Sequence, residues 1–180
     1  MKKTLTIVFA IIVIAIIGFI SYQFTSREKN NVIQPTGAQS PKDTTYLIND
    51  ESITLKNGIS TIAIASSSAS KETTQYFGNE ATGDLNGDGK VDTAFLLTQD
   101  NGGSGTFFYV TVALLTDKGY QGTNAILLGD RIAPQATEIK DGEIIVNYAD
   151  RKLDEPFSVQ PSVGVSKYFK VVNGILVEVK

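Results

Sequence analysis

Nine consecutive residues near the middle of the chain have the side chains best suited to binding an ion. The segment 84–92 reads Asp-Leu-Asn-Gly-Asp-Gly-Lys-Val-Asp, so oxygen-bearing side chains recur at its first, third, fifth and ninth positions. Hard cations such as Ca²⁺ take about six to eight oxygen ligands, and a tightly curled backbone can direct alternate side chains toward one point. Glycines at the fourth and sixth positions permit that curl because glycine adopts positive φ without steric strain. The sequence therefore predicts a calcium site formed by the side chains of Asp84, Asn86, Asp88 and Asp92 and the backbone carbonyl of Lys90.

The loop resembles the calcium loops of the EF-hand, dockerin, thrombospondin type 3 and FG-GAP families, which share the pattern Asp-x-Asn-x-Asp-Gly-x-x-Asp. It differs from a complete EF-hand at the twelfth position, where Phe95 replaces the bidentate glutamate. Residues 93–98 form a short run without helical spacing of polar residues, so we expect a strand to leave the loop. The FG-GAP-like context implies that Asp92 is a side-chain ligand. The loop occurs once, so a repeated propeller is not expected.

An ordinary acidic surface turn is the alternative interpretation of the same residues, since Asp-Gly and Asn-Gly are common turn formers. Three carboxylates on one short loop, however, repel one another unless a cation lies between them. This repulsion favours the calcium interpretation.

The rest of the composition excludes several kinds of chemistry. The chain has no histidine and no cysteine, which rules out Ser-His-Asp and Cys-His catalysis and leaves zinc only carboxylate ligands. The net charge is −3 and the basic residues are scattered, so no nucleic-acid-binding surface is expected. Carboxylate-based glycoside hydrolysis remains open, and the acidic residues available for it are Glu80, Asp100, Asp130, Asp150 and Glu155.

The first 26 residues indicate where the protein resides. Residues 4–26 carry no charge, and 5–20 consist almost wholly of Ile, Val, Leu, Phe and Ala, which suits a helix of about 20 residues spanning a bilayer. The segment ends in bulky residues, whereas a cleavable signal peptide ends in small ones, so an uncleaved signal-anchor over 1–26 is favoured over a cleaved leader. Lys2 and Lys3 place the N-terminus in the cytoplasm by the positive-inside rule. The remainder of the chain is then expected outside the cell membrane.

Two further segments follow the expected anchor. Residues 27–44 are polar and contain two prolines and few apolar groups, which indicates a flexible linker. Residues 45–180 are long enough for one domain with a substantial core. We therefore expect an extracytoplasmic calcium-binding β domain over 45–180.

Strand patterns dominate that domain. Residues 108–114 alternate to give one wholly apolar face and one mixed face, as in a central core strand. The dipeptides Asn57-Gly58, Asp141-Gly142 and Asn173-Gly174 separate apolar runs and predict hairpins at about 52–63, 136–149 and 166–179. Further strands are expected at 73–78, 93–99 and 124–128, and a short helix only within 63–71. The predicted fold is mainly β, a single antiparallel β-sandwich or open barrel of about seven to nine strands.

Two functions of different classes are compatible with these features. The first is a non-enzymatic, calcium-binding module of the cell envelope, anchored to the membrane and either structural or bound to a protein or polysaccharide ligand. The second is a small envelope hydrolase that uses carboxylates and holds calcium as a structural ion. The segments 76–80, 105–110, 129–135 and 146–151 resemble small, uncharacterised bacterial cell-envelope proteins, a resemblance that implies a location but no activity.

Overall fold

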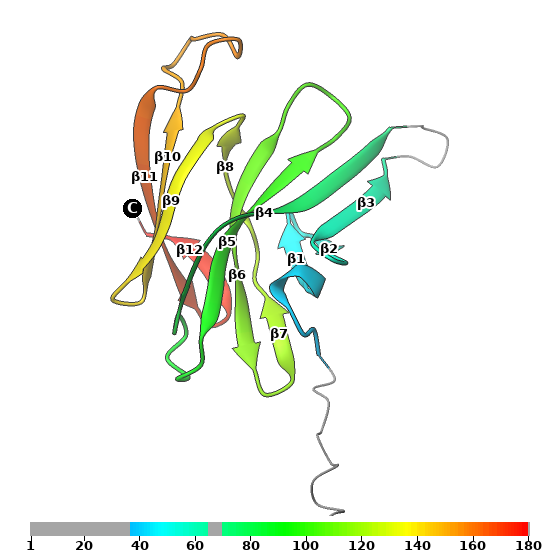
Figure 1. Ribbon diagram of the computed structural model, residues 1–180, viewed down its shortest axis with the longest axis vertical. Helices are drawn as coiled ribbons and strands as arrows, with labels where there is room; N and C mark the ends of the chain where they lie inside the picture. The colour runs from blue at the N-terminus through cyan, green and yellow to red at the C-terminus, as the bar shows by residue number, and fades with distance from the viewer. Residues whose placement is uncertain (1–36, 65–69, 180) are drawn as a thin grey trace, which may run out of the picture. The chain divides into compact units, whose positions relative to one another are not determined.

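The computed structural model describes residues 37–64 and 70–179, which belong to one β-rich unit (Figure 1). The described residues contain no helix that is both long enough and apolar enough to span a bilayer. The expected anchor over 1–26 lies outside them. The elements are the 3₁₀ helix η1 (Pro41–Asp43) and the strands β1 (Thr45–Ile48), β2 (Glu51–Thr54), β3 (Ile59–Ala63), β4 (Lys71–Gly83), β5 (Asp92–Asp100), β6 (Phe107–Thr116), β7 (Gly119–Gly122), β8 (Ile126–Asp130), β9 (Ala133–Lys140), β10 (Glu143–Asp150), β11 (Val163–Val172) and β12 (Ile175–Glu178).

The strands form three antiparallel sheets. The largest has the order β3-β4-β5-β6-β7, and β8 pairs with β6 beyond the end of β7. The second has the order β12-β11-β10-β9, and the third is the β1-β2 hairpin. The predicted mainly β, antiparallel class is therefore confirmed. The twelve strands of the described residues exceed the seven to nine expected, because short strands such as β1 and β7 lack long alternating patterns.

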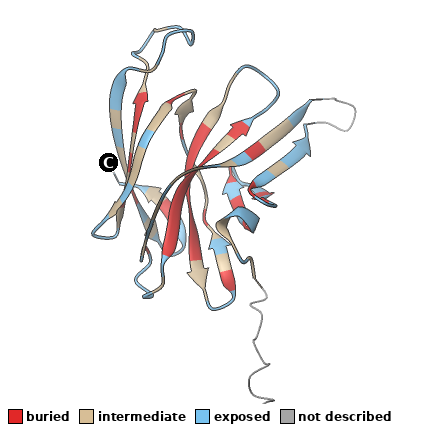
Figure 2. Ribbon diagram, viewed as in Figure 1, coloured by how far each residue is buried: buried red, intermediate tan, exposed pale blue. Residues whose placement is uncertain are grey.

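The six-stranded sheet is buried on both faces at its centre. One face of β5 and β6, including Leu96 and Val110, packs against Val146 of β10 and Phe169 of β11. The opposite face, including Phe95 and the other alternating residues of these strands, packs beneath the β1-β2 hairpin. Figure 2 shows the resulting band of buried residues along β5. The alternation over 108–114 thus indicated a central strand correctly.

The hairpin expected at each Asn-Gly or Asp-Gly dipeptide forms at two of the three positions. Asp141-Gly142 joins β9 to β10, and Asn173-Gly174 joins β11 to β12. At Asn57-Gly58 both residues have positive φ, 53° and 82°, as a tight turn of this type requires. The flanking strands nevertheless separate, because β2 pairs with β1 and β3 pairs with β4. The expected 52–63 hairpin is therefore wrong beyond the single bridge between Lys56 and Ile59.

The other expected elements lie close to those observed. The strands expected at 73–78, 93–99 and 124–128 correspond to parts of β4, β5 and β8. The short helix considered within 63–71 falls largely on 65–69, which lie outside the described residues. Residues 37–44, at the end of the expected linker, make backbone hydrogen bonds to the sheets: Tyr120 N donates to Ala38 O, and Leu55 N donates to Thr44 O.

Candidate metal centre

The segment 84–92 connects β4 to β5, so the strand expected after the loop is present. β4 ends at Gly83, which pairs with Asp92 at the start of β5. Gly87 and Gly89 both have φ of +80°, and the space beside each, where a Cβ would lie, is open. The backbone between the two strands therefore curls as the glycines predicted, and any other residue at either position would be strained.

Asp84 closes this curl. Its two carboxylate oxygens accept hydrogen bonds from Gly87 N at 2.7 Å and Gly89 N at 2.9 Å. A carboxylate has about four lone-pair sites, so these two bonds leave acceptor capacity on both oxygens. Asn86 Oδ1 accepts a bond from Asp88 N at 3.0 Å, which tightens the same turn.

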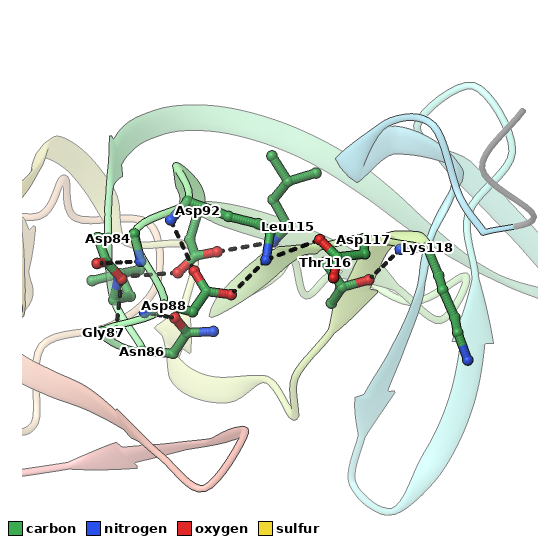
Figure 3. A network of polar contacts seen from close by, with 12 residues as sticks. Asp84, Asn86, Gly87, Asp88, Asp92, Leu115, Thr116, Asp117 and Lys118 are labelled. Atoms are coloured by element: carbon green, nitrogen blue, oxygen red, sulfur yellow. Dashed lines mark hydrogen bonds and ion pairs between the residues drawn. The ribbon is translucent and has the colours of Figure 1, made fainter. Parts of the chain in front are cut away.

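Asp92 lies behind the loop and is fully buried. Its carboxylate accepts hydrogen bonds from Leu85 N at 3.0 Å and from Leu115 N of β6 at 2.8 Å (Figure 3). Burial raises the pKa of Asp92, the two backbone bonds partly offset that rise, and the negative charges of Asp88 and Asp84 add to it. Asp92 therefore joins the loop to β6 and is electrostatically coupled to both other aspartates.

Asp88 and Lys90 form the exposed side of the loop. Asp88 Oδ1 accepts a bond from Lys90 N at 2.9 Å, and its other oxygen lies 3.4 Å from Lys90 Nζ. The backbone bond from Lys90 is the main reason that the pKa of Asp88 is lowered. Lys90 Nζ also lies 3.3 Å from Asp117, whose hydrogen bond is the main reason that the pKa of Lys90 is raised. The ammonium group thus lies beside two carboxylates.

Asp117 is a member of this group that the sequence did not indicate. It lies in the turn between β6 and β7, which begins directly after the β6 segment that Asp92 binds (Figure 3). An isolated aspartate in a turn has no sequence signature of its own. Only the pairing of β5 with β6 brings it next to the loop.

The structure supplies the right kind of ligands for calcium but does not gather them at one point. All the predicted ligands are oxygen donors, as a hard cation prefers. Within 37–64 and 70–179, however, no three His, Cys, Asp or Glu side chains are arranged so that they could hold a metal ion. The carboxylates of Asp84, Asp88 and Asp92 each bind separate backbone amides. Residues 84–92 therefore form one curl, but each of these three carboxylates is hydrogen-bonded to backbone amides of its own.

Each of the five acidic residues considered for hydrolysis contacts a different neighbouring residue. Glu80 accepts a hydrogen bond from Tyr76 Oη, Asp130 binds Arg131, and Glu155 binds Lys152. Asp100 and Asp150 accept backbone bonds from Gly102 and Arg151. The structure instead places Glu51 and Glu72 at one hollow of about 290 Å³. Burial raises the pKa of Glu72, and the charge of Glu51 contributes to the rise.

Comparison with known proteins identifies no relative of this chain. No protein-family model, curated protein or solved structure matches it.

Proposed function

We propose that residues 84–92 bind one calcium ion, and that the chain is a non-enzymatic binding or structural module of the cell envelope. The observation that carries the proposal is the curl at Gly87 and Gly89, which presents Asp84, Asn86 and Asp88 on one short turn in front of the buried Asp92. The side chains of Asp84, Asn86, Asp88 and Asp92 and the carbonyl of Lys90 would hold the ion. A bound dication would offset the mutual repulsion of the three aspartates.

The expected location agrees with such a site. An anchor over 1–26 with a cytoplasmic N-terminus would place the β unit outside the membrane. Extracellular modules bind calcium with dissociation constants of about 10⁻⁴ to 10⁻³ M, so a loop without the bidentate glutamate suits that compartment. The chain has no cysteine and hence no disulfide, and a metal would provide the cross-link that small secreted domains commonly need.

Thermal unfolding of the full-length chain in detergent tests the proposal. A ligand present at about a hundred times its dissociation constant stabilises the folded state by about 2.7 kcal/mol, which for a unit of this size is a rise in Tm of several degrees. We expect that rise with calcium relative to chelator, and a smaller one with magnesium, which requires stricter octahedral geometry.

Two variants test whether the calcium-dependent rise in Tm arises from residues 84–92. Asp84→Ala is expected to abolish the calcium-dependent rise, whatever its effect on the Tm in chelator, because the comparison is made within each variant. Asp154→Asn, a remote exposed aspartate, is the matched control and should retain the full rise. Equal Tm values with calcium and chelator, in wild-type protein first stripped of metal, would leave the loop as an acidic turn.

A carboxylate-based hydrolase with a structural calcium is the second candidate. It is favoured by the shared hollow of Glu51 and Glu72 and by the raised pKa of Glu72. If this hollow were catalytic, purified protein would release reducing ends from an envelope polysaccharide, and Glu72→Gln would lose that activity. Absence of release from wild-type protein across envelope glycans would remove this candidate.

A further inference from the structure

Strand β3 is an end strand of the six-stranded sheet, and each of its residues except the half-buried Ser60 is exposed. It bears two of three neighbouring isoleucines that are largely exposed, Ile59 at 43%, Ile62 at 41% and, just beyond the strand, Ile64 at 52%. Its sequence, Ile-Ser-Thr-Ile-Ala, contains no charged residue and no proline. Charges and prolines are the usual means by which edge strands avoid pairing with other chains.

The hydrogen bonds between β3 and β4 show which backbone groups of β3 face outward. Gly58 O accepts from Tyr76 N, and Ile64 N donates to Ser70 O, so even-numbered residues direct their backbone groups toward β4. In an antiparallel strand the alternate residues direct theirs the opposite way. Ile59 exchanges its two outward bonds with Lys56. The outward N–H and C=O groups of Thr61 and Ala63 therefore face the open edge.

The edges of β12, β7, β1 and β9 are covered or interrupted. The Asn124 side chain bonds both Leu176 N and Leu176 O on β12. Tyr120 on β7 donates to Ala38 O, and Leu47 on β1 bonds Thr123 and Ala125. β9 carries Pro134 next to the irregularity in its pairing with β10. Among the described strands, β3 thus combines an open edge with exposed apolar side chains.

We propose that β3 pairs in antiparallel fashion with β3 of a second copy of this chain, about a two-fold axis at Ile62. In this register Thr61 of each copy lies opposite Ala63 of the other, so all four outward groups of each strand are used. Ile62 lies opposite Ile62 of the second copy, and Ser60 lies opposite Ile64. Two-fold dimers require such a self-complementary surface.

Charge is compatible with this pairing. No like charges meet across the axis, because the strand is uncharged. Two acidic residues lie beside this segment: Glu72, which pairs with Ile62 across β3-β4, and Glu51, which lines one hollow with Ile62 and Glu72. The two Glu72 residues would be separated by three strand spacings, about 14 Å, which exceeds the screening length at physiological salt. The contact is short, so the dimer is weak and concentration-dependent.

Cysteine scanning tests both the pairing and its register. The chain has no cysteine, so one substitution in the full-length protein introduces the only thiol. Residues at the two-fold axis form a non-hydrogen-bonded pair with Cα atoms about 4.5 Å apart, which is within the range of a disulfide. We expect Ile62→Cys to form a disulfide dimer at least tenfold faster than Ser60→Cys, Thr61→Cys or Ala63→Cys. Leu153→Cys, on a remote exposed loop, measures random collision of copies within detergent micelles.

Charge exchange at the axis distinguishes self-pairing from capture of a foreign peptide. Ile62→Lys and Ile62→Glu should each lower the dimer fraction in sedimentation, because like charges then lie opposite each other. Mixing the two variants should restore a dimer containing one of each. A dimer insensitive to both substitutions, a cross-linking rate at Ile62→Cys no greater than at Leu153→Cys, or a maximum at another β3 position would overturn the proposal. So would a wild-type protein that captures peptides along β3 while staying monomeric.

Discussion

At the scale of single residues, the ammonium group of Lys90 is the cation that the loop holds in this structure. It lies within 3.4 Å of both Asp88 and Asp117, at the exposed side of the curl. A calcium ion at the proposed site would draw on the same carboxylate of Asp88. Lys90 would therefore both supply a backbone carbonyl to the proposed site and compete with the metal through its side chain.

Lys90→Met separates these two contributions, since it keeps the carbonyl and removes the charge. We expect calcium affinity, measured by calorimetry on the full-length protein, to increase several-fold. Lys118→Met removes a charge from the neighbouring turn and should change affinity much less. Weaker calcium binding by Lys90→Met would show that the ammonium group orders the loop and does not compete with calcium.

Asp92 gives the metal-free protein a specific dependence on pH. Its folded-state pKa is raised, chiefly by burial, so the fold favours the protonated form. The stability that this group contributes is therefore fully present below the ordinary Asp pKa and is lost as pH rises through the raised value.

Asp92→Asn provides the reference for that dependence. In chelator, the unfolding free energy of wild type minus that of Asp92→Asn should decrease as pH rises through the raised pKa and then stay constant. The asparagine side chain also offers only one acceptor oxygen to Leu85 N and Leu115 N. The Asp92→Asn variant should therefore be less stable than wild type by about 1–3 kcal/mol at neutral pH. A difference that grows with pH over the acidic range would mean that the carboxylate is stabilised as the anion.

At the scale of elements, the turn dipeptides show where local sequence suffices. Asn57-Gly58, Asp141-Gly142 and Asn173-Gly174 all adopt positive φ at both residues, as their types predict. Two of these turns join paired strands. At the third, Ile53 and Leu55 are buried under the central sheet. This burial places β2 beside β1, so β2 does not pair with β3. Tertiary packing, which no dipeptide encodes, decides the pairing there.

Gly122 permits the close approach of the β1-β2 hairpin to β7. A Cβ at this position would meet the carbonyl of Thr45 and lie 2.6 Å from the Tyr46 ring. We expect Gly122→Ala to lower the unfolding free energy by about 1–3 kcal/mol in denaturant titration, because the hairpin must shift. Gly164→Ala on β11, where a Cβ meets nothing, is the matched control and should be close to neutral. Equal losses in the two variants would mean that the hairpin accommodates the extra group.

At the scale of the whole molecule, the sequence predicted the kind of fold better than its arrangement. The alternation over 108–114 identified the central strand, and the curl at 84–92 was indicated by its glycines. The two-sided burial of β5 was not predicted, because a short apolar run does not reveal which elements cover each face. Asp117 was missed for a related reason, since it reaches the loop only through the pairing of β5 with β6.

The N-terminal segment determines how the whole chain should behave in a cell. Twelve Ile, Leu, Val or Phe residues within 5–20 favour membrane insertion by roughly 5 kcal/mol. We expect the full-length protein to remain in the membrane fraction after carbonate extraction. N-terminal sequencing should give no soluble form that begins between Ser21 and Arg27, and recovery of such a form would establish a cleaved leader instead.

The aromatic contact between the hairpin and the central sheet makes the protein's ultraviolet spectrum a report on one interface. Phe95 of β5 stacks on Tyr76 of β4 at 4.4 Å between centroids and meets Tyr46 of β1 edge-on at 5.4 Å. The chain has no tryptophan, so tyrosines dominate its near-ultraviolet absorption and circular dichroism. Burial raises the pKa of both Tyr46 and Tyr76. Their phenols should ionise late in an alkaline titration, and the circular dichroism they share should disappear when the β1-β2 hairpin detaches, even if the four-stranded sheet stays folded.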